Sequence, residues 1–132
     1  LVGLVSSVAG GCQYCVAHNA HGLALDGVSP EKQAAVWEFE TSAVFTAAER
    51  AALRVARGGG QVPNGVSDSE LRDLLAHYSP RQVAEIVAVI GLFGFLNRWN
   101  ATLRVPLEAE PRALAERDIA RHGWHPGRHA AE

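Results

Sequence analysis

The stretch from residue 79 to residue 104 reads SPRQVAEIVAVIGLFGFLNRWNATLR, and it decides the fold class. Ser79 can cap a helix whose first residue is Pro80, and Gln82 can reach back to the backbone of the cap. The middle of the stretch is apolar all the way round, so we predict one long helix over 80–104. A helix without a wet face must be covered on every side. We therefore expect a central helix, partly covered by another subunit; the core helix of a monomer is the alternative.

The same kind of start signal occurs elsewhere in the chain, and strand-like alternation never persists. A hydroxyl side chain that accepts from free backbone N–H groups, with Glu or Gln three residues later, marks the start of a helix. These signals are Thr46-Ala-Ala-Glu49, Ser67-Asp-Ser-Glu70 and, with proline after the cap, Ser29-Pro30. We predict an all-α fold of about six helices, over residues 12–26, 30–39, 47–57, 68–77, 80–104 and 110–122, with Leu1 to Ala9 as the end of another helix.

Length, composition and charge limit the kinds of protein that this chain can be. A chain of 132 residues with 48% hydrophobic content can bury one ordinary core, so we expect residues 1–132 to form a single domain. A formal charge of -2 gives no basic field for nucleic acid or for a membrane surface. The apolar run from Val83 to Leu96 is shorter than the roughly 20 residues that span a bilayer. We expect no membrane segment, a cytoplasmic location and, because Leu1 is not methionine, a missing upstream segment.

The residues that carry chemistry lie in Gly10-Gly11-Cys12-Gln13-Tyr14-Cys15-Val16-Ala17-His18-Asn19-Ala20-His21. Two cysteines are too few for a disulfide scaffold, and a close pair indicates reactivity. The glycines end one helix and the next begins near Cys12, where backbone N–H groups favour a thiolate. Residues three apart share one face of a helix, so Cys12 and Cys15 can form a disulfide.

A general base is expected one turn further along the helix. Asn19 is best placed on the helical wheel but cannot carry a proton, so His18 is the nearest titratable group; His21 lies on the far side from Cys12. Two other readings stay open. The cysteines can be structural core residues, or they can bind zinc with His18 and His21. Because those four residues spiral halfway round one helix, they do not converge on an ion, and we predict neither a metal nor a cofactor.

At these residues the chain resembles the alkylhydroperoxidase AhpD-like branch of the carboxymuconolactone decarboxylase superfamily. The matching segments are Gly11-Cys12-Gln13-Tyr14-Cys15 with the histidine-bearing turn that follows, Phe45-Thr46-Ala47-Ala48-Glu49-Arg50-Ala51-Ala52-Leu53, and Phe95-Leu96-Asn97-Arg98-Trp99-Asn100. The resemblance implies an AhpD-like helical fold, assembled as a trimer or a hexamer, that reduces alkyl hydroperoxides or hydrogen peroxide. It implies a redox-active disulfide reset by an external dithiol, from a thioredoxin-like or lipoyl protein.

The resemblance also implies roles for single residues. Cys15 would meet the peroxide and Cys12 would resolve it, whereas the helix dipole favours Cys12 as the thiolate. The family histidine falls at Asn19, so His18 would replace it. The family's relay glutamate would fall before Leu1 and is absent from this chain. Its candidate substitutes are Glu38, Glu40 and Glu49, each better explained as a solvated charge on a helix.

A few further residues are candidates for supporting roles. The candidate pocket or supporting residues are Tyr14, Asn19, Asn97 and Arg98. The simpler interpretation of residues 97–100 is that Arg98 pairs with a carboxylate while Trp99 packs in the core. The ending, residues 123–129, would be an arm on a neighbouring subunit or a frayed tail. Two other functions stay open: a lyase like the carboxymuconolactone decarboxylases, which need no cysteine pair, and a redox-sensing protein without enzymatic activity.

Overall fold

The computed structural model describes residues 1–130, and this part of the chain is helical without a strand. The all-α prediction is therefore confirmed. The α-helices are α1 (Val2–Ala9), α2 (Gln13–Leu25), α3 (Pro30–Ala34), α4 (Ala47–Gly59), α5 (Asp68–His77), α6 (Pro80–Leu103) and α7 (Ala109–Asp118). Short 3-10 turns follow α3 and α7 and close the described chain: η1 (Ala35–Glu38), η2 (Ala120–His122) and η3 (Gly127–His129).

The predicted helix starts are where the hydroxyl residues placed them. Thr46, Ser67 and Ser79 each form a reciprocal capping box with the residue three positions later. Ser29 caps α3 through its side chain, with proline at the start of the helix. Each cap satisfies N–H groups that have no partner inside the helix, typically worth about 1 kcal/mol. Two predicted helices depart from the structure: 30–39 tightens into η1 after α3, and 110–122 ends as α7 at Asp118 and is followed by η2.

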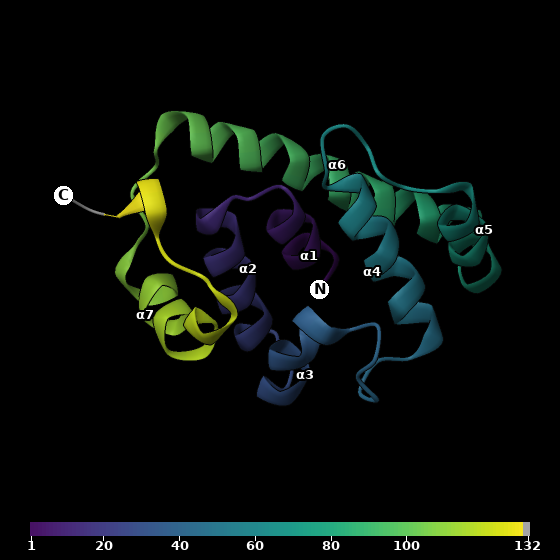
Figure 1. Cartoon of the computed structure of the whole chain (residues 1–132), viewed down its shortest axis with the longest axis horizontal. Coiled ribbons are helices and arrows are strands. Elements are labelled where there is room, and N and C mark those ends of the chain that lie inside the picture. Colours follow the sequence, from purple (N-terminus) through teal and green to yellow (C-terminus); the bar gives the residue numbers. More distant parts are fainter. Residues whose placement is uncertain (131–132) are drawn as a thin grey trace.

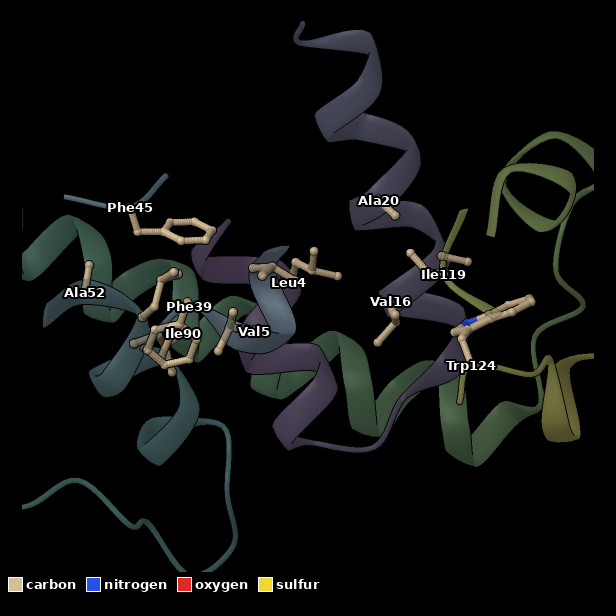
Figure 2. Packing of buried hydrophobic residues seen from close by; sticks show 14 of the residues in the cluster. Leu4, Val5, Val16, Ala20, Phe39, Phe45, Ala52, Ile90, Ile119 and Trp124 are labelled. Atoms are coloured by element: carbon tan, nitrogen blue, oxygen red, sulfur yellow. The ribbon is translucent and has the colours of Figure 1, made fainter. Parts of the chain in front are cut away.

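Helix α1 is short but central. It contacts α2, α4 and α6, so the longer helices are packed around it (Figure 1). Leu4 and Val5 fill the contact, and their helix also buries Ser6 and Ser7. Figure 2 shows Leu4 and Val5 between Phe39 and Ile90 on one side and α2 on the other. Because only three residues separate the end of α1 from the start of α2, the packing of α1 also fixes where the cysteine motif begins.

The buried hydrophobic cluster combines side chains from most of the described chain, and Figure 2 labels some of them. Its larger aromatic and aliphatic members are Leu4, Val16, Val36, Phe39, Phe45, Leu53, Leu74, Ile90, Leu107, Ile119 and Trp124. Burial of a side chain of this size contributes about 1.5–3 kcal/mol. Trp124 and Ile119 belong to this core, so the residues after α7 are not a frayed tail.

Helix α6 lies along one side of the molecule rather than at its centre (Figure 1). Phe95, Trp99 and Leu103 are 57%, 54% and 58% exposed. The sequence led us to expect Trp99 in the core, and this was wrong because the helices of this chain cover only one face of α6. A second copy of the chain on the outer face remains a prediction.

Among the described residues, α6 is long and apolar enough, by length and composition alone, to cross a bilayer. The sequence-based expectation of no such segment counted only its apolar middle and left out the polar turns at both ends. Length and composition are weak grounds for a membrane span, because helices of soluble domains meet the same criterion. In this fold α6 contacts α1, α2, α4 and α5, which makes it an integral part of the helical packing.

Candidate functional site

The cysteine motif begins at a tight turn between α1 and α2. Gly11 has a φ of 71°, a left-handed conformation that costs little for glycine and is unfavourable for other residues. The turn brings the backbone N–H of Cys12 within 3.2 Å of the Ser7 carbonyl oxygen, to which it donates. Cys12 then caps α2, since its Sγ accepts from the backbone N–H of Cys15 at 3.4 Å. The glycine pair thus places a sulfur at the positive end of a helix.

Both cysteines are free thiols and both are buried, with 1% of Cys12 and 3% of Cys15 exposed. Asn100, on α6, donates from Nδ2 to the Sγ of Cys15 at 3.4 Å. This polar contact joins the cysteine motif of α2 to α6, and Asn100 is a residue that contacts the site.

The two thiols differ in acidity. The hydrogen bond from the Cys15 thiol lowers the pKa of Cys12 and outweighs the opposing effect of burial. Backbone N–H groups of Cys15 and Tyr14 and the charge of His129 lower it further. The same thiol hydrogen bond, together with burial, raises the pKa of Cys15. These shifts favour ionisation at Cys12 and keep the proton on Cys15.

A cluster of polar side chains extends from the motif to the start of α7. The Tyr14 hydroxyl donates to Glu108 Oε1 at 3.0 Å, and Nε2 of His18 is 2.7 Å from Glu108 Oε2. The rings of Tyr14 and His18 are 4.4 Å apart between centroids. Burial and the hydrogen bond to Glu108 raise the pKa of Tyr14 to about 12, and the charges of Glu108 and of both cysteines add to this effect.

Tyr14, between the two cysteines in the sequence, thus contacts a carboxylate–histidine pair. His18 was predicted to reach back to Cys15, but its ring nitrogen contacts Glu108 instead. Asn19 donates from Nδ2 to the Cys15 carbonyl oxygen at 2.7 Å and to Ser7 Oγ at 3.5 Å. Asn19 therefore stabilises the backbone of the motif. Among the described residues, it forms no hydrogen bond to either sulfur.

The carboxylates that we considered from the sequence lie elsewhere. Glu40 pairs with Arg54 and Arg57, and Glu49 pairs with Lys32 while closing a capping box. Sequence reasoning missed Glu108, whose position 90 residues after His18 gives no local signal. It is the N-cap residue of α7, yet its side chain makes no capping hydrogen bond, which leaves the carboxylate available to Tyr14 and His18.

The Asn97–Asn100 segment also differs from its simpler reading. Arg98 donates to the Gly94 carbonyl oxygen at 2.8 Å, and none of the ion pairs among the described residues includes it. Asn97 is buried against Gly10, where a Cβ would lie 2.7 Å from its Nδ2. Asn97 therefore packs under the turn that leads to Cys12, and the pairing of Arg98 with a carboxylate was wrong.

A small cavity of about 70 Å³ opens beside the first turn of α2. Gly11, Gln13 and Val16 form its floor, and Trp37 and Trp124 are part of its wall. Trp37 stacks on His122 with ring centroids 4.4 Å apart. The residues on either side of Cys12 line this cavity, and neither cysteine is among its lining residues. Residues 1–130 contain no group of three or more side chains placed to bind a metal ion.

Part of the chain matches a known protein family. The model of the carboxymuconolactone decarboxylase family matches residues 1–58, which include the cysteine motif. Among curated proteins, the uncharacterized protein YnjA of Escherichia coli K12 is 30% identical over 97 residues. That match covers 74% of this chain and 53% of YnjA, so the chain spans about half the length of this relative.

Solved structures show the same helical arrangement. The debrominase Bmp8 superposes with a TM-score of 0.83 at 38% identity, over 87% of this chain and 62% of that protein. A cysteine-to-alanine variant of Bmp8 in complex with 2,3,4-tribromopyrrole gives a TM-score of 0.84 at 37% identity, with the same coverage of both chains.

A protein of unknown function from Agrobacterium tumefaciens, described as a candidate AhpD of antioxidant defence, gives a TM-score of 0.76 at 26% identity. This match covers 83% of our chain and 75% of that one. The family match over residues 1–58, the shared fold and the motif support the resemblance to the AhpD-like, carboxymuconolactone decarboxylase superfamily that is seen in the sequence.

Proposed function

We propose that the protein is a thiol peroxidase that reduces organic hydroperoxides or hydrogen peroxide through a Cys12–Cys15 dithiol–disulfide cycle. The observation that carries the proposal is the hydrogen bond from the backbone N–H of Cys15 to Cys12 Sγ at the N-terminus of α2, where the Cys15 side chain also lowers the pKa of Cys12. A thiolate is the reactive form of cysteine. A second thiol in contact with it can complete a two-electron reduction.

In the proposed cycle the Cys12 thiolate attacks the terminal oxygen of the peroxide. An S–O bond forms, the O–O bond breaks, and the leaving alkoxide takes a proton and departs as an alcohol. The Cys15 thiol then attacks the sulfur of the Cys12 sulfenic acid, and water leaves as the disulfide forms. An external dithiol, thioredoxin-like or carrying a lipoyl group, restores both thiols. These assignments reverse the cysteine roles that the family resemblance implies, because here the acidic thiol is Cys12.

Tyr14, His18 and Glu108 are the proposed proton-handling groups. The hydroxyl of Tyr14 is bonded to Glu108, and burial together with that bond raises its pKa. The phenol stays protonated at neutral pH, so it can donate a hydrogen bond to a developing alkoxide. Glu108 and His18 can replace that proton from the surface, since 56% of the Glu108 side chain and 37% of the His18 side chain are exposed.

A second candidate function is reductive dehalogenation of a small aromatic compound, and the 38% identity to the debrominase Bmp8 favours it. The same sulfurs can carry out this chemistry. The Cys12 thiolate would attack the halogen, the carbon–halogen bond would break, and the ring carbon would take a proton. Cys15 would then displace halide from sulfur and form the same disulfide, so two electrons from the dithiol replace halogen by hydrogen.

Substrate consumption by the reduced protein separates these functions. Organic hydroperoxide and a brominated pyrrole are each offered to wild type, Cys12→Ser and Cys15→Ser, and thiol loss, alcohol and bromide are measured. Peroxidase activity predicts alcohol and one disulfide per chain, whereas bromide release identifies the dehalogenase. Dimedone, which traps sulfenic acid, should label Cys12 in the Cys15→Ser variant. If both variants consume peroxide like the wild type, the protein is not a thiol peroxidase, and the lyase reading returns.

A further inference from the structure

Within residues 1–130, Asn100 is the one side chain outside the cysteine motif that forms a hydrogen bond to a cysteine sulfur. Its Nδ2 lies 3.4 Å from Cys15 Sγ, across a separation of 85 residues, and the contact joins two helices that pack together, α6 and α2. The carbonyl oxygen of Asn100 accepts from the backbone N–H groups of Arg104 and Val105, which closes the last turn of α6. The packing of α6 therefore fixes the position of this donor.

Asn100 lies at the end of the covered face of α6. Ile90 and Asn97, one and two turns before it, are 7% and 5% exposed, and Asn100 itself is half-buried. Residues three apart share one face of a helix, so Asn97 and Asn100 both face the cysteine motif. An amide neither gains nor loses a proton at ordinary pH, and its N–H groups can only donate. Asn100 therefore remains a donor whatever the charge of the sulfurs.

The influences on Cys15 depend on the state of Cys12. The side chain of Cys12 raises the pKa of Cys15 most, burial raises it further, and the hydrogen bond from Asn100 lowers it. The charge of Cys12, the ionisable neighbour that acts on Cys15, also raises it. Oxidation of Cys12 to a sulfenic acid removes the thiolate charge. The donor at Asn100 stays in place, so ionisation of Cys15 becomes easier at the step in which this sulfur has to attack.

We propose that Asn100 is a positioning residue for the second step of the cycle: its Nδ2 group holds Cys15 Sγ and stabilises the negative charge that this sulfur carries as it attacks Cys12. The S–H bond of Cys15 breaks, an S–S bond forms, and the S–O bond of the Cys12 sulfenic acid breaks. The departing hydroxide takes the proton and leaves as water. The inference rests on the proposed function for its purpose, but the effect of Asn100 on the acidity of Cys15 can be measured without substrate.

The test measures the ionisation of Cys15 alone, in a Cys12→Ser background. The rate at which iodoacetamide alkylates Cys15 is followed as a function of pH, because the thiolate is the reactive form. Asn100→Leu keeps a similar shape and removes the donor. A hydrogen bond to a charged group is equivalent to roughly one to two pKa units, so the midpoint of the profile should move up by about one unit or more.

Asn19→Leu in the same background is the matched control. Asn19 also donates from Nδ2 to Cys15, but to the backbone carbonyl oxygen, at 2.7 Å. Loss of this amide leaves the contact of Asn100 with the sulfur in place, so the midpoint should stay unchanged. Asn100→Asp is a second test variant. It keeps the shape of the side chain and replaces the donor by a negatively charged acceptor, so the midpoint should rise at least as far as in Asn100→Leu.

An unchanged midpoint in folded Asn100→Leu overturns the inference, and if that variant does not fold, an unchanged midpoint in Asn100→Asp does so. With both cysteines present, Asn100→Leu should form the Cys12 sulfenic acid, trapped with dimedone, as fast as the wild type, but form the disulfide about tenfold more slowly. Equal rates of disulfide formation also overturn it. If the midpoint shifts but the wild type consumes no peroxide, the proposed function fails while the effect of Asn100 on Cys15 stands.

Discussion

Replacing Gly60 by alanine tests whether the close approach of α4 to α1 positions the cysteine motif. Gly60 ends α4 with a φ of -77°, which any residue adopts, so the substitution introduces no backbone strain. A Cβ at this position would lie 2.5 Å from the Ser6 carbonyl oxygen and 3.0 Å from the Ala9 Cβ. Both atoms belong to α1, whose end leads through the glycine turn into Cys12. The backbone of α1 must move to make room.

The expected cost follows from that overlap. Forcing an extra methyl group into a packed contact costs about 1–3 kcal/mol. With an unfolding entropy of about 2.1 cal/mol/K per residue, each kcal/mol lowers the melting temperature of a chain of this length by about 4 °C. Gly60→Ala should therefore melt about 4–11 °C below the wild type. Because Ser7 holds the N–H of Cys12, we also expect the displaced helix to slow formation of the Cys12–Cys15 disulfide.

A matched glycine provides the control. Gly22 lies inside α2, and a Cβ there would meet no atom within 4 Å. Gly22→Ala should gain about 0.5–1 kcal/mol from the lower entropy of the unfolded chain, and its melting temperature should rise by about 2–4 °C. Differential scanning calorimetry of both variants measures the contrast. Equal melting temperatures for the two alanine variants would show that the α1–α4 contact has slack, and the argument from close approach would fail.

Three other variants test separate contacts. Glu108→Gln should be less stable than the wild type by up to about 1 kcal/mol near neutral pH, the range for exposed pairs, in urea unfolding. Burial raises the pKa of Glu108, but hydrogen bonds from its own backbone N–H, from His18 and from Tyr14 outweigh burial and lower that pKa. The difference in stability between wild type and variant should therefore vanish as the pH falls through the pKa of Glu108. Tyr14→Phe should remove the tyrosinate absorbance step near pH 12. Phe95→Arg should reduce the sedimenting mass if α6 binds a second copy.

The fold could be predicted because its signals are local. Three capping boxes, at Thr46, Ser67 and Ser79, use residues three positions apart, and each was found as the sequence indicated. The exposure of α6 could not be predicted in the same way. The pattern shows that a helix has apolar residues on all sides, but not how many neighbouring helices the chain supplies to cover them.

In the candidate site, too, the residues that are close in sequence could be predicted, and those that are distant in sequence could not. Cys12, Cys15, Tyr14 and His18 lie within one stretch of sequence, and the spacing alone placed the sulfurs together at the start of a helix. Glu108 reaches the site from the other end of the chain, 90 residues after His18. Its position depends on how α7 packs against α2. No periodicity in the sequence encodes that packing.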